Sequence, residues 1–198
     1  MKWNRGKLME ATRRQMPSSR WEHTLRVVET AAELARITGA DPEKADIAAI
    51  LHDYCKFWPE ERQREWILRY RLPRELLQYN KELWHAPVGA EAVREELGIE
   101  DEEVLSAIRS HTTGRPGMTL LEKVIFLADY IEPGRSFPGV EEVRRLARED
   151  LDRAVLKALD NTIVYLVGRR LKVYPLTVIT RNDLLDKIPQ THPKEESH

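Results

Sequence analysis

Leu51-His52-Asp53-Tyr54-Cys55-Lys56 is the stretch on which the interpretation of the whole chain depends. In it a histidine is followed directly by an aspartate, at the end of an apolar helical run that begins near Ala45. On a regular helix two neighbouring side chains point about 100° apart. Both can reach one cation only where the helix ends, and Pro59 shortly downstream indicates such an end. The pair therefore predicts part of a metal site.

Four further side chains that can bind a cation are spread along the chain: His23, His85, His111 and Asp129. The spacing of Val104, Ala107, Ile108 and His111 places this histidine on the buried face of a helix, at its C-terminal end. Any single histidine near a helix end is more often a cap or a surface residue than a metal ligand. We expect these side chains to converge on one metal site because they occur together.

Asp129 is the most informative of these residues, because it shares an apolar helix face with Leu121 and Ile125. A carboxylate in such a place is costly to bury unless it is paired or bound to a metal. The alternative to metal binding is a buried ion pair with Arg26 or Lys56.

Capping and breaking residues predict helices along nearly the whole chain, and no strand. Ser19 and Glu22 form a capping-box pattern, as do Thr119 and Glu122, and Asp41-Pro42 is a further start signal. The expected helices cover residues 6–16, 19–38, 42–51, two segments between Pro59 and Trp84, then 85–97, 102–111, 120–131, 141–148, 152–167 and 176–188. The sequence thus predicts an all-α, single-domain bundle over residues 1–190, with a core at 18–135, C-terminal helices at 140–190 and a polar tail at 191–198.

Composition limits the classes of function. Lys and Arg number 32 against 33 Asp and Glu, giving a net charge of -1, which argues against a nucleic-acid binder. No run approaches the roughly 20 apolar residues that cross a membrane, and no secretory signal is visible. Cys55 is the one cysteine, which excludes an internal disulfide and favours the reducing cytoplasm. Its expected role, like that of Tyr54, is packing.

The order His23, His52-Asp53, Asp129 resembles the H…HD…D signature of the HD superfamily of metal-dependent phosphohydrolases. Longer stretches extend the resemblance, and they are Trp84-His85-Ala86-Pro87-Val88-Gly89-Ala90, Ser110-His111-Thr112-Thr113-Gly114 and Leu127-Ala128-Asp129-Tyr130-Ile131-Glu132-Pro133-Gly134-Arg135. Together with the stretch at 51–56 they are similar to the YqeK family, the bacterial symmetrical diadenosine tetraphosphate hydrolases. The similarity covers most of residues 20–175.

The resemblance implies an HD-type helical bundle that cuts diadenosine tetraphosphate into two ADP. It implies iron, with manganese or another first-row ion as the alternative, held by His23, His52, Asp53 and Asp129. The catalytic residues would be Asp53, Lys56, His85 and His111. The implied substrate-binding residues are His23, Lys56, His85, His111, Thr112, Asp129, Arg135, Arg170, Leu171, Lys172, Val173, Tyr174 and Pro175.

Several alternatives stay open at this stage. His85 and His111 either contact phosphate or hold a second metal with a bridging Asp53. Arg135 is either a fork for phosphate or a charge at the end of a helix, and the alternating Arg170, Lys172 and Tyr174 either face one ligand or form an exposed basic loop. The Trp and Tyr residues from Tyr54 to Trp84 either stack an adenine or pack the core. A nucleotidase, a phosphodiesterase and a non-catalytic nucleotide sensor are alternative functions, and a homodimer is possible.

Overall fold

The computed structural model describes residues 3–188, and within this range it contains ten α-helices, two short 3-10 helices and no strand. The all-α class predicted from the sequence is confirmed. The elements are α1 (Arg5–Arg13), α2 (Ser18–Thr38), α3 (Pro42–Leu51), α4 (Glu60–Arg69), η1 (Arg74–Gln78), η2 (Lys81–Leu83), α5 (His85–Leu97), α6 (Glu102–Ser110), α7 (Leu120–Ile131), α8 (Val140–Glu149), α9 (Leu151–Gly168) and α10 (Pro175–Lys187). The predicted tail at 191–198 lies outside the described residues.

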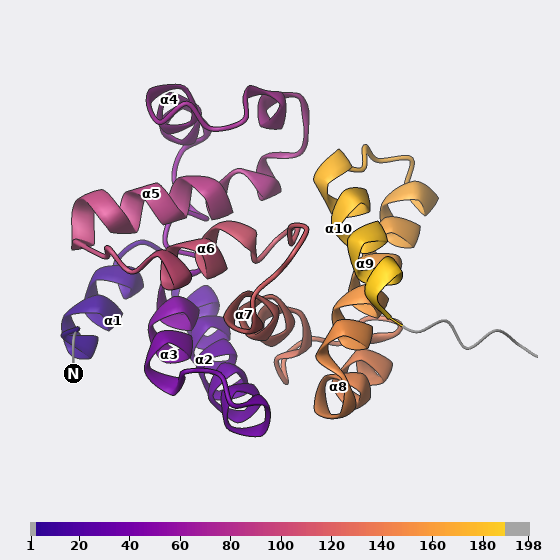
Figure 1. Cartoon of the computed structure of the whole chain (residues 1–198). Coiled ribbons are helices and arrows are strands. Elements are labelled where there is room, and N and C mark those ends of the chain that lie inside the picture. The colour runs from indigo at the N-terminus through magenta and orange to yellow at the C-terminus, as the bar shows by residue number, and fades with distance from the viewer. Residues whose placement is uncertain (1–2, 189–198) are drawn as a thin grey trace, which may run out of the picture.

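Helices α2, α3, α6 and α7 form the centre of the molecule, where each of them contacts at least two of the others. Helix α3 is buried continuously from Ile47 to Leu51, and its alanines Ala45, Ala48 and Ala49 allow the neighbouring helices to approach closely. Helix α5 covers α6, and α1 packs on α3. Helices α8, α9 and α10, coloured orange to yellow, are grouped on one side of α7 (Figure 1). Within residues 3–188 no helix is both long and apolar enough to cross a membrane.

The predicted starts of α3 and α7 are confirmed by their hydrogen bonds. The Asp41 side chain accepts from the backbone amides of Glu43 and Lys44 at the start of α3. Thr119 and Glu122 form both hydrogen bonds of the capping box at the start of α7. These ends matter for the site, since α3 and α7 each carry candidate metal ligands close to their C-termini.

The N-cap predicted for α2, Ser19, is wrong by two residues. The helix begins at Ser18, with Pro17 at the N-cap position in an extended conformation and without a side-chain cap. Ser19 therefore lies inside the first turn, where its hydroxyl cannot act as an N-cap. Helix α1 also ends earlier than predicted, at Arg13, because the next amides turn back to carbonyls three residues away: Gln15 bonds to Thr12 and Met16 to Arg13.

The two serine and threonine positions predicted as caps should respond differently to alanine. Thr119→Ala removes a formed cap and should lower the free energy of unfolding by about 1 kcal/mol. Ser19→Ala removes no cap bond and should leave it within about 0.5 kcal/mol of the wild type. Urea denaturation of both variants measures this difference. Equal destabilisation by the two substitutions would contradict the assignment of the helix starts.

Candidate metal centre

All four histidines of residues 3–188 meet in the interior of the molecule, and each is at most 5% exposed. His23 lies in the second turn of α2 and His85 is the first residue of α5. His52 and His111 occupy the C-cap positions of α3 and α6. The sequence predicted this convergence, and it arises because the ends of three helices meet beside α2.

Asp53 lies between two pairs of these histidines and has no solvent exposure. Its Oδ2 atom is 3.0 Å from Nε2 of His52 and 3.8 Å from Nε2 of His23. Its Oδ1 atom is 3.1 Å from Nε2 of His85 and 3.9 Å from Nε2 of His111. Because α3 ends at Leu51, the side chains of His52 and Asp53 can both turn toward the same place, as the sequence predicted.

Asp129 completes the cluster from the last turn of α7. Its Oδ1 atom is 3.0 Å from Nε2 of His23 and 2.6 Å from Nη2 of Arg135. The ion pair with Arg26 or Lys56 considered above is wrong: the nearest carboxylates to these two cations are those of Glu132 and Glu82, respectively. Arg26 lies one turn after His23 on α2. It therefore faces Glu132, which lies one turn after Asp129.

The outer ring nitrogens of three histidines fix the direction of the inner ones. Nδ1 of His52 donates to the carbonyl of Ala49, and Nδ1 of His111 donates to the carbonyl of Ile108, both at 2.7 Å. Nδ1 of His23 is 3.0 Å from a carboxylate oxygen of Glu132. A carbonyl or carboxylate oxygen only accepts, so Nδ1 carries a proton in each of these rings, and Nε2 is the nitrogen that faces the centre.

Several polar atoms of the cluster are buried without a hydrogen bond of normal geometry. They are Nε2 of His23, Nε2 of His52, Oδ1 of Asp53 and Nδ1 of His85. Such atoms are rare in native proteins unless a water or an ion satisfies them. Two overlapping sets of these side chains have ligand atoms close enough to share a cation: His23, His52 and Asp129, and His52, Asp53 and His111. Imidazole with carboxylate suits first-row divalent ions, so the residues fit a metal of this class.

The electrostatics of the cluster keep its two carboxylates ionised. Burial lowers the pKa of His52, but the negative charge of Asp53 outweighs this effect and raises it. Burial raises the pKa of Asp53, but the adjacent imidazoles of His52 and His85 outweigh this effect and hold the pKa well below its usual range. Burial also raises the pKa of Asp129, but the close contact with His23 and the charge of His52 bring it well below the usual value. Burial lowers the pKa of His111 to about 3. Ionised carboxylates and a neutral imidazole are the forms that ligate metals.

Two residues near the cluster were not predicted from the sequence. The Nε atom of Arg20 donates to Oδ2 of Asp53 at 2.5 Å, and its side chain is 15% exposed. Glu132 contacts the outer nitrogen of His23. Helical spacing contains a signal for both, since Arg20 lies three residues before His23 and Glu132 three residues after Asp129, each on the same face as the candidate ligand.

The cations predicted to bind phosphate both pair with carboxylates in this structure. Lys56 donates to Glu82 at 2.8 Å, and Glu82 is mostly exposed. Arg135 donates through Nη2 to the Asp129 carboxylate and through Nε to the Asp129 carbonyl. Thr112 is half-buried directly after His111. Arg135 thus contacts the cluster directly, Thr112 follows His111 in the chain, and the backbone amide of Lys56 donates to the carbonyl of Asp53.

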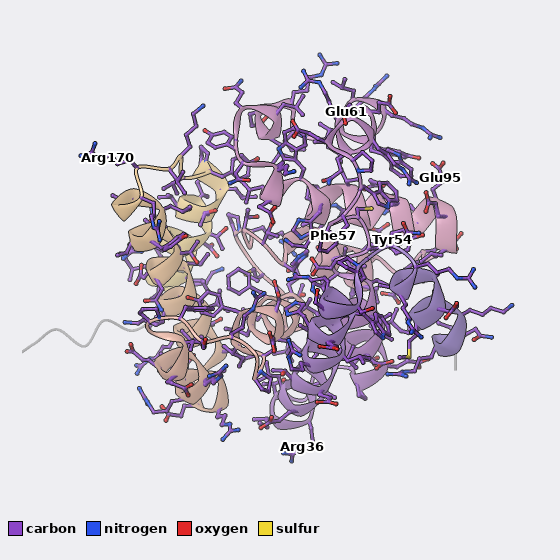
Figure 2. All side chains as sticks on the ribbon, turned by 180° about the vertical axis from the view of Figure 1, so that it is seen from behind. Arg36, Tyr54, Phe57, Glu61, Glu95 and Arg170 are labelled. Atoms are coloured by element: carbon purple, nitrogen blue, oxygen red, sulfur yellow. The ribbon has the colours of Figure 1, made fainter. Side chains whose placement is uncertain are left out.

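The segment 170–175 does not alternate regularly. Arg170 has a φ of 54°, in the left-handed region, and its side chain points away from the molecule (Figure 2). Lys172 donates to the carbonyl of Gln78, and the ring of Tyr174 packs edge-on against that of Tyr79. The extended conformation expected to bring three side chains to one face is therefore wrong at Arg170, whereas Lys172 and Tyr174 share the side that contacts the segment after η1.

Most aromatic residues between Tyr54 and Trp84 belong to the core. Tyr54, Trp58, Trp66 and Trp84 are buried, and Trp58 packs edge-on against both Tyr54 and Trp66. The thiol of Cys55 is free and fully buried. The packing role expected for Tyr54 and Cys55 is confirmed.

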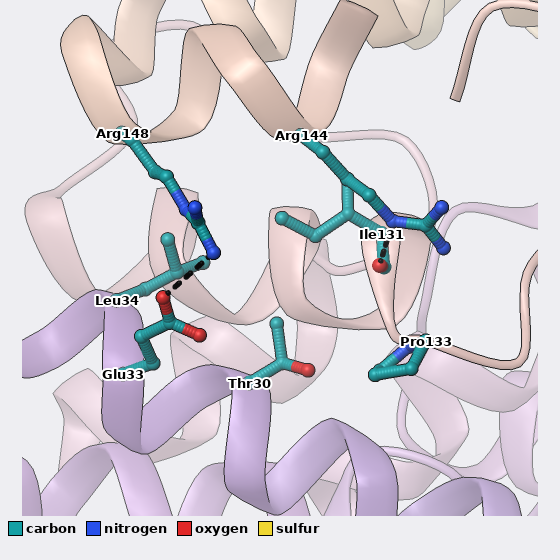
Figure 3. A pocket seen from close by; sticks show the side chains of 7 residues that line it. All are labelled: Thr30, Glu33, Leu34, Ile131, Pro133, Arg144 and Arg148. Atoms are coloured by element: carbon teal, nitrogen blue, oxygen red, sulfur yellow. Dashed lines mark hydrogen bonds and ion pairs between the residues drawn. The ribbon is translucent and has the colours of Figure 1, made fainter. Parts of the chain in front are cut away.

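A pocket between α2, α7 and α8 lies away from the cluster (Figure 3). It is lined by Thr30, Glu33, Leu34, Ile131, Pro133, Arg144 and Arg148, none of which is a candidate ligand. Within it Arg144 donates to the carbonyls of Ile131, Glu132 and Arg135. This arginine holds the backbone of the turn that follows Asp129, so the pocket has a structural connection to the candidate site.

Known proteins share both the sequence and the fold of this chain. Residues 20–134 match the HD domain family. A Bacillus subtilis protein named symmetrical bis(5'-nucleosyl)-tetraphosphatase is 52% identical over 182 residues, which cover 92% of this chain and 98% of that protein. A Staphylococcus aureus protein of the same name is 41% identical over 174 residues, covering 87% of this chain and 90% of the relative.

A solved structure agrees with these relatives. The crystal structure of a predicted HD superfamily hydrolase involved in NAD metabolism, from Clostridium acetobutylicum, has a TM-score of 0.90 and 40% identity. The superposition covers 94% of this chain and 99% of the Clostridium acetobutylicum chain. The family match spans the helices that carry His23, His52, Asp53 and Asp129, and the relatives extend the similarity to nearly full length. The chain therefore belongs to the HD family, in the branch that contains these tetraphosphatases.

Proposed function

We propose that this protein hydrolyses diadenosine tetraphosphate symmetrically and releases two molecules of ADP. The observation that carries the proposal is the buried cluster of histidines around Asp53, whose inner nitrogens have no hydrogen bond of normal geometry at His23 and His52. Two relatives of nearly the same length are named for this activity. A chain of the same family and nearly the same extent is expected to act on the same class of substrate.

His23, His52, Asp53 and Asp129 are the residues that we expect to hold a divalent cation. Such an ion, when bound, lowers the pKa of a water molecule and polarises a phosphoryl oxygen. HD proteins bind divalent metals, and within this class we propose iron, with manganese or another first-row ion as the alternative. The two oxygens of Asp53 face different histidine pairs, so a second ion shared with His85 and His111 is compatible with the distances.

The reaction breaks the bridge between the second and third phosphates. A water oxygen attacks one central phosphorus, the bond to the bridging oxygen breaks, and ADP leaves with the electron pair while the water loses a proton. We expect Lys56 and Arg135, with Arg20 beside Asp53, to stabilise negative charge on the phosphate oxygens. The leaving ADP is a stabilised anion, so strong help from a general acid is not required.

His85 and His111 are 3.0 Å apart at their Nε2 atoms. Burial lowers the pKa of both, so the neutral rings present a lone pair. To donate a hydrogen bond to phosphate from Nε2, His111 has to take up a proton together with the negatively charged substrate. As a ligand of a second ion it needs no such proton. Thr112 and the segment Arg170 to Pro175 complete the substrate-binding residues that we propose.

Some expectations from the sequence are not tested by the structure and stay predictions. They are the single domain over residues 1–190, the absence of nucleic-acid binding, the cytoplasmic location and the possible homodimer. Gel filtration with light scattering tests the last of these.

The products of the reaction decide the proposed function. With Fe²⁺ or Mn²⁺, diadenosine tetraphosphate should give ADP alone, and in ¹⁸O-labelled water one of each two ADP molecules should carry the label. Asp53→Asn should lower kcat/KM by about 100-fold or more, because a ligand matters at least as much as the groups that orient ligands. Chromatography with mass spectrometry measures both. Formation of ATP and AMP, or no turnover with any divalent metal, would contradict the proposal.

The ion pair between Lys56 and Glu82 should compete with substrate. Glu82→Gln removes the exposed partner of Lys56 and should lower KM by up to about fivefold, equivalent to ~1 kcal/mol, with kcat little changed. Glu95→Gln breaks a similar exposed pair with Arg69 and serves as the matched control. Steady-state kinetics at low salt measures the difference. A KM for Glu82→Gln equal to that of the control would remove Lys56 from the phosphate-binding residues.

A further inference from the structure

Glu132 is a buried carboxylate directly behind the candidate metal centre. It occupies the C-cap position of α7 and is 1% exposed. One oxygen lies 3.0 Å from Nδ1 of His23. The other accepts from Nε of Arg26 at 2.6 Å and from the backbone amide of Gly134 at 2.5 Å. These three partners occupy both oxygens, so the carboxylate has one defined orientation.

The contacts of Glu132 form a regular pattern between two helices. On α2, His23 and Arg26 are three residues apart, and at the end of α7 Asp129 and Glu132 are also three apart, so each pair shares one face. His23 consequently has one carboxylate at each ring nitrogen: Asp129 at Nε2 and Glu132 at Nδ1, both at 3.0 Å. The two nitrogens cannot both act as ligands, and the partners of Glu132 determine which one carries the proton.

We propose that Glu132 is the positioning residue that fixes the tautomer and the orientation of His23 for cation binding, an inference that rests on the metal centre proposed above. Two donors, Arg26 and Gly134, hold the carboxylate as an acceptor. Its remaining oxygen is 3.0 Å from Nδ1 of His23 and 3.8 Å from Nε of Arg135, so the close partner is the histidine, and a proton on Nδ1 satisfies it while Nε2 is directed toward the centre. Carboxylates that orient a ligand histidine in this way typically contribute 10- to 100-fold to metal affinity.

The residues around Glu132 support its orientation. A Cβ atom placed on Gly134 would lie 2.7 Å from the guanidinium of Arg26, so only glycine allows Arg26 to reach the carboxylate without a shift. Arg144 donates to the carbonyl of Glu132 at 2.9 Å and holds its backbone from the opposite side. Glu132 is therefore fixed through its side chain by α2 and through its backbone by α8.

Replacing Glu132 by glutamine gives a sharp test, because the two side chains have the same shape. The single oxygen of the glutamine amide is required by Arg26 and Gly134, so its NH2 group faces His23 and should move the imidazole proton from Nδ1 to Nε2. We expect ¹⁵N NMR of the metal-free protein to show this change for Glu132→Gln. Chelator competition should show divalent metal affinity lowered by about 10- to 100-fold.

Glu122→Gln is the matched control. Glu122 is a fully buried carboxylate on the same helix that also pairs with an arginine, Arg115, but within residues 3–188 its hydrogen-bond partners are serine, threonine and arginine rather than histidine. This control should lose thermal stability while keeping both the His23 tautomer and the metal affinity. Gly134→Ala, which displaces Arg26, should weaken metal binding less than Glu132→Gln, and it replaces that variant if the glutamine protein does not fold.

Particular results would overturn the inference. If Glu132→Gln kept the proton on Nδ1 of His23 and bound metal within about twofold of the wild type, Glu132 would have only the structural role of the control. If the wild-type protein bound no divalent cation, the proposed metal centre would fail, and the NMR result alone would decide whether Glu132 sets the His23 tautomer. The two failures are thus distinguishable.

Discussion

The negative charge of Asp53 is the constraint on which the centre of the molecule depends. A fully buried carboxylate is very unfavourable unless nearby groups compensate it. The compensation comes from Arg20 on α2, from His52 at the end of α3 and from His85 at the start of α5. The helix ends therefore have to meet at one point, and this requirement explains why α3 stops at Leu51 and α5 begins at His85.

The same contacts that complete the helices also prepare the histidines for a cation. The last carbonyls of a helix have no partner within it. At the ends of α3 and α6, the carbonyls of Ala49 and Ile108 accept the Nδ1 protons of His52 and His111. One hydrogen bond thus satisfies the backbone and directs Nε2 inward. His23 lies inside a helix and cannot use this solution, so its outer nitrogen needs a side-chain acceptor, which is Glu132.

The sequence predicted the features that depend on local chemistry. Thr119 with Glu122 and Asp41 with Pro42 identified two helix starts, and the inward direction of Asp129, which is half-buried, followed from its apolar neighbours. What it could not predict was the pairing of charges between helices. To predict that Arg26 pairs with Glu132 rather than with Asp129, one has to know how far α2 is shifted along α7. The spacing of residues within one helix does not contain this information. The pairing of Arg20 with Asp53 likewise depends on how α2 lies against the end of α3, although the spacing of Arg20 from His23 indicated its face.

The error at Ser19 has a related origin. The pattern of a capping box was present, but Pro17 already has the extended conformation that precedes a helix, and the first turn began one residue before the predicted N-cap. Backbone geometry decided between two starts that the side chains alone left nearly equivalent. Thr119 had no such competitor, since its own ψ of 168° is extended and its hydroxyl faces the amide of Glu122.

The partners of the cations separate those that maintain the site from those that can bind substrate. Arg20 pairs with the fully buried Asp53, so moving it toward a phosphate would leave an uncompensated charge in the interior. Lys56 pairs with Glu82, which is 59% exposed and can be hydrated once the lysine leaves. An exposed pair of this kind contributes little to stability. Lys56 can therefore exchange Glu82 for a phosphate at a small cost in free energy. Arg20 remains paired with Asp53, so it contacts a phosphate only if the substrate binds next to this ion pair.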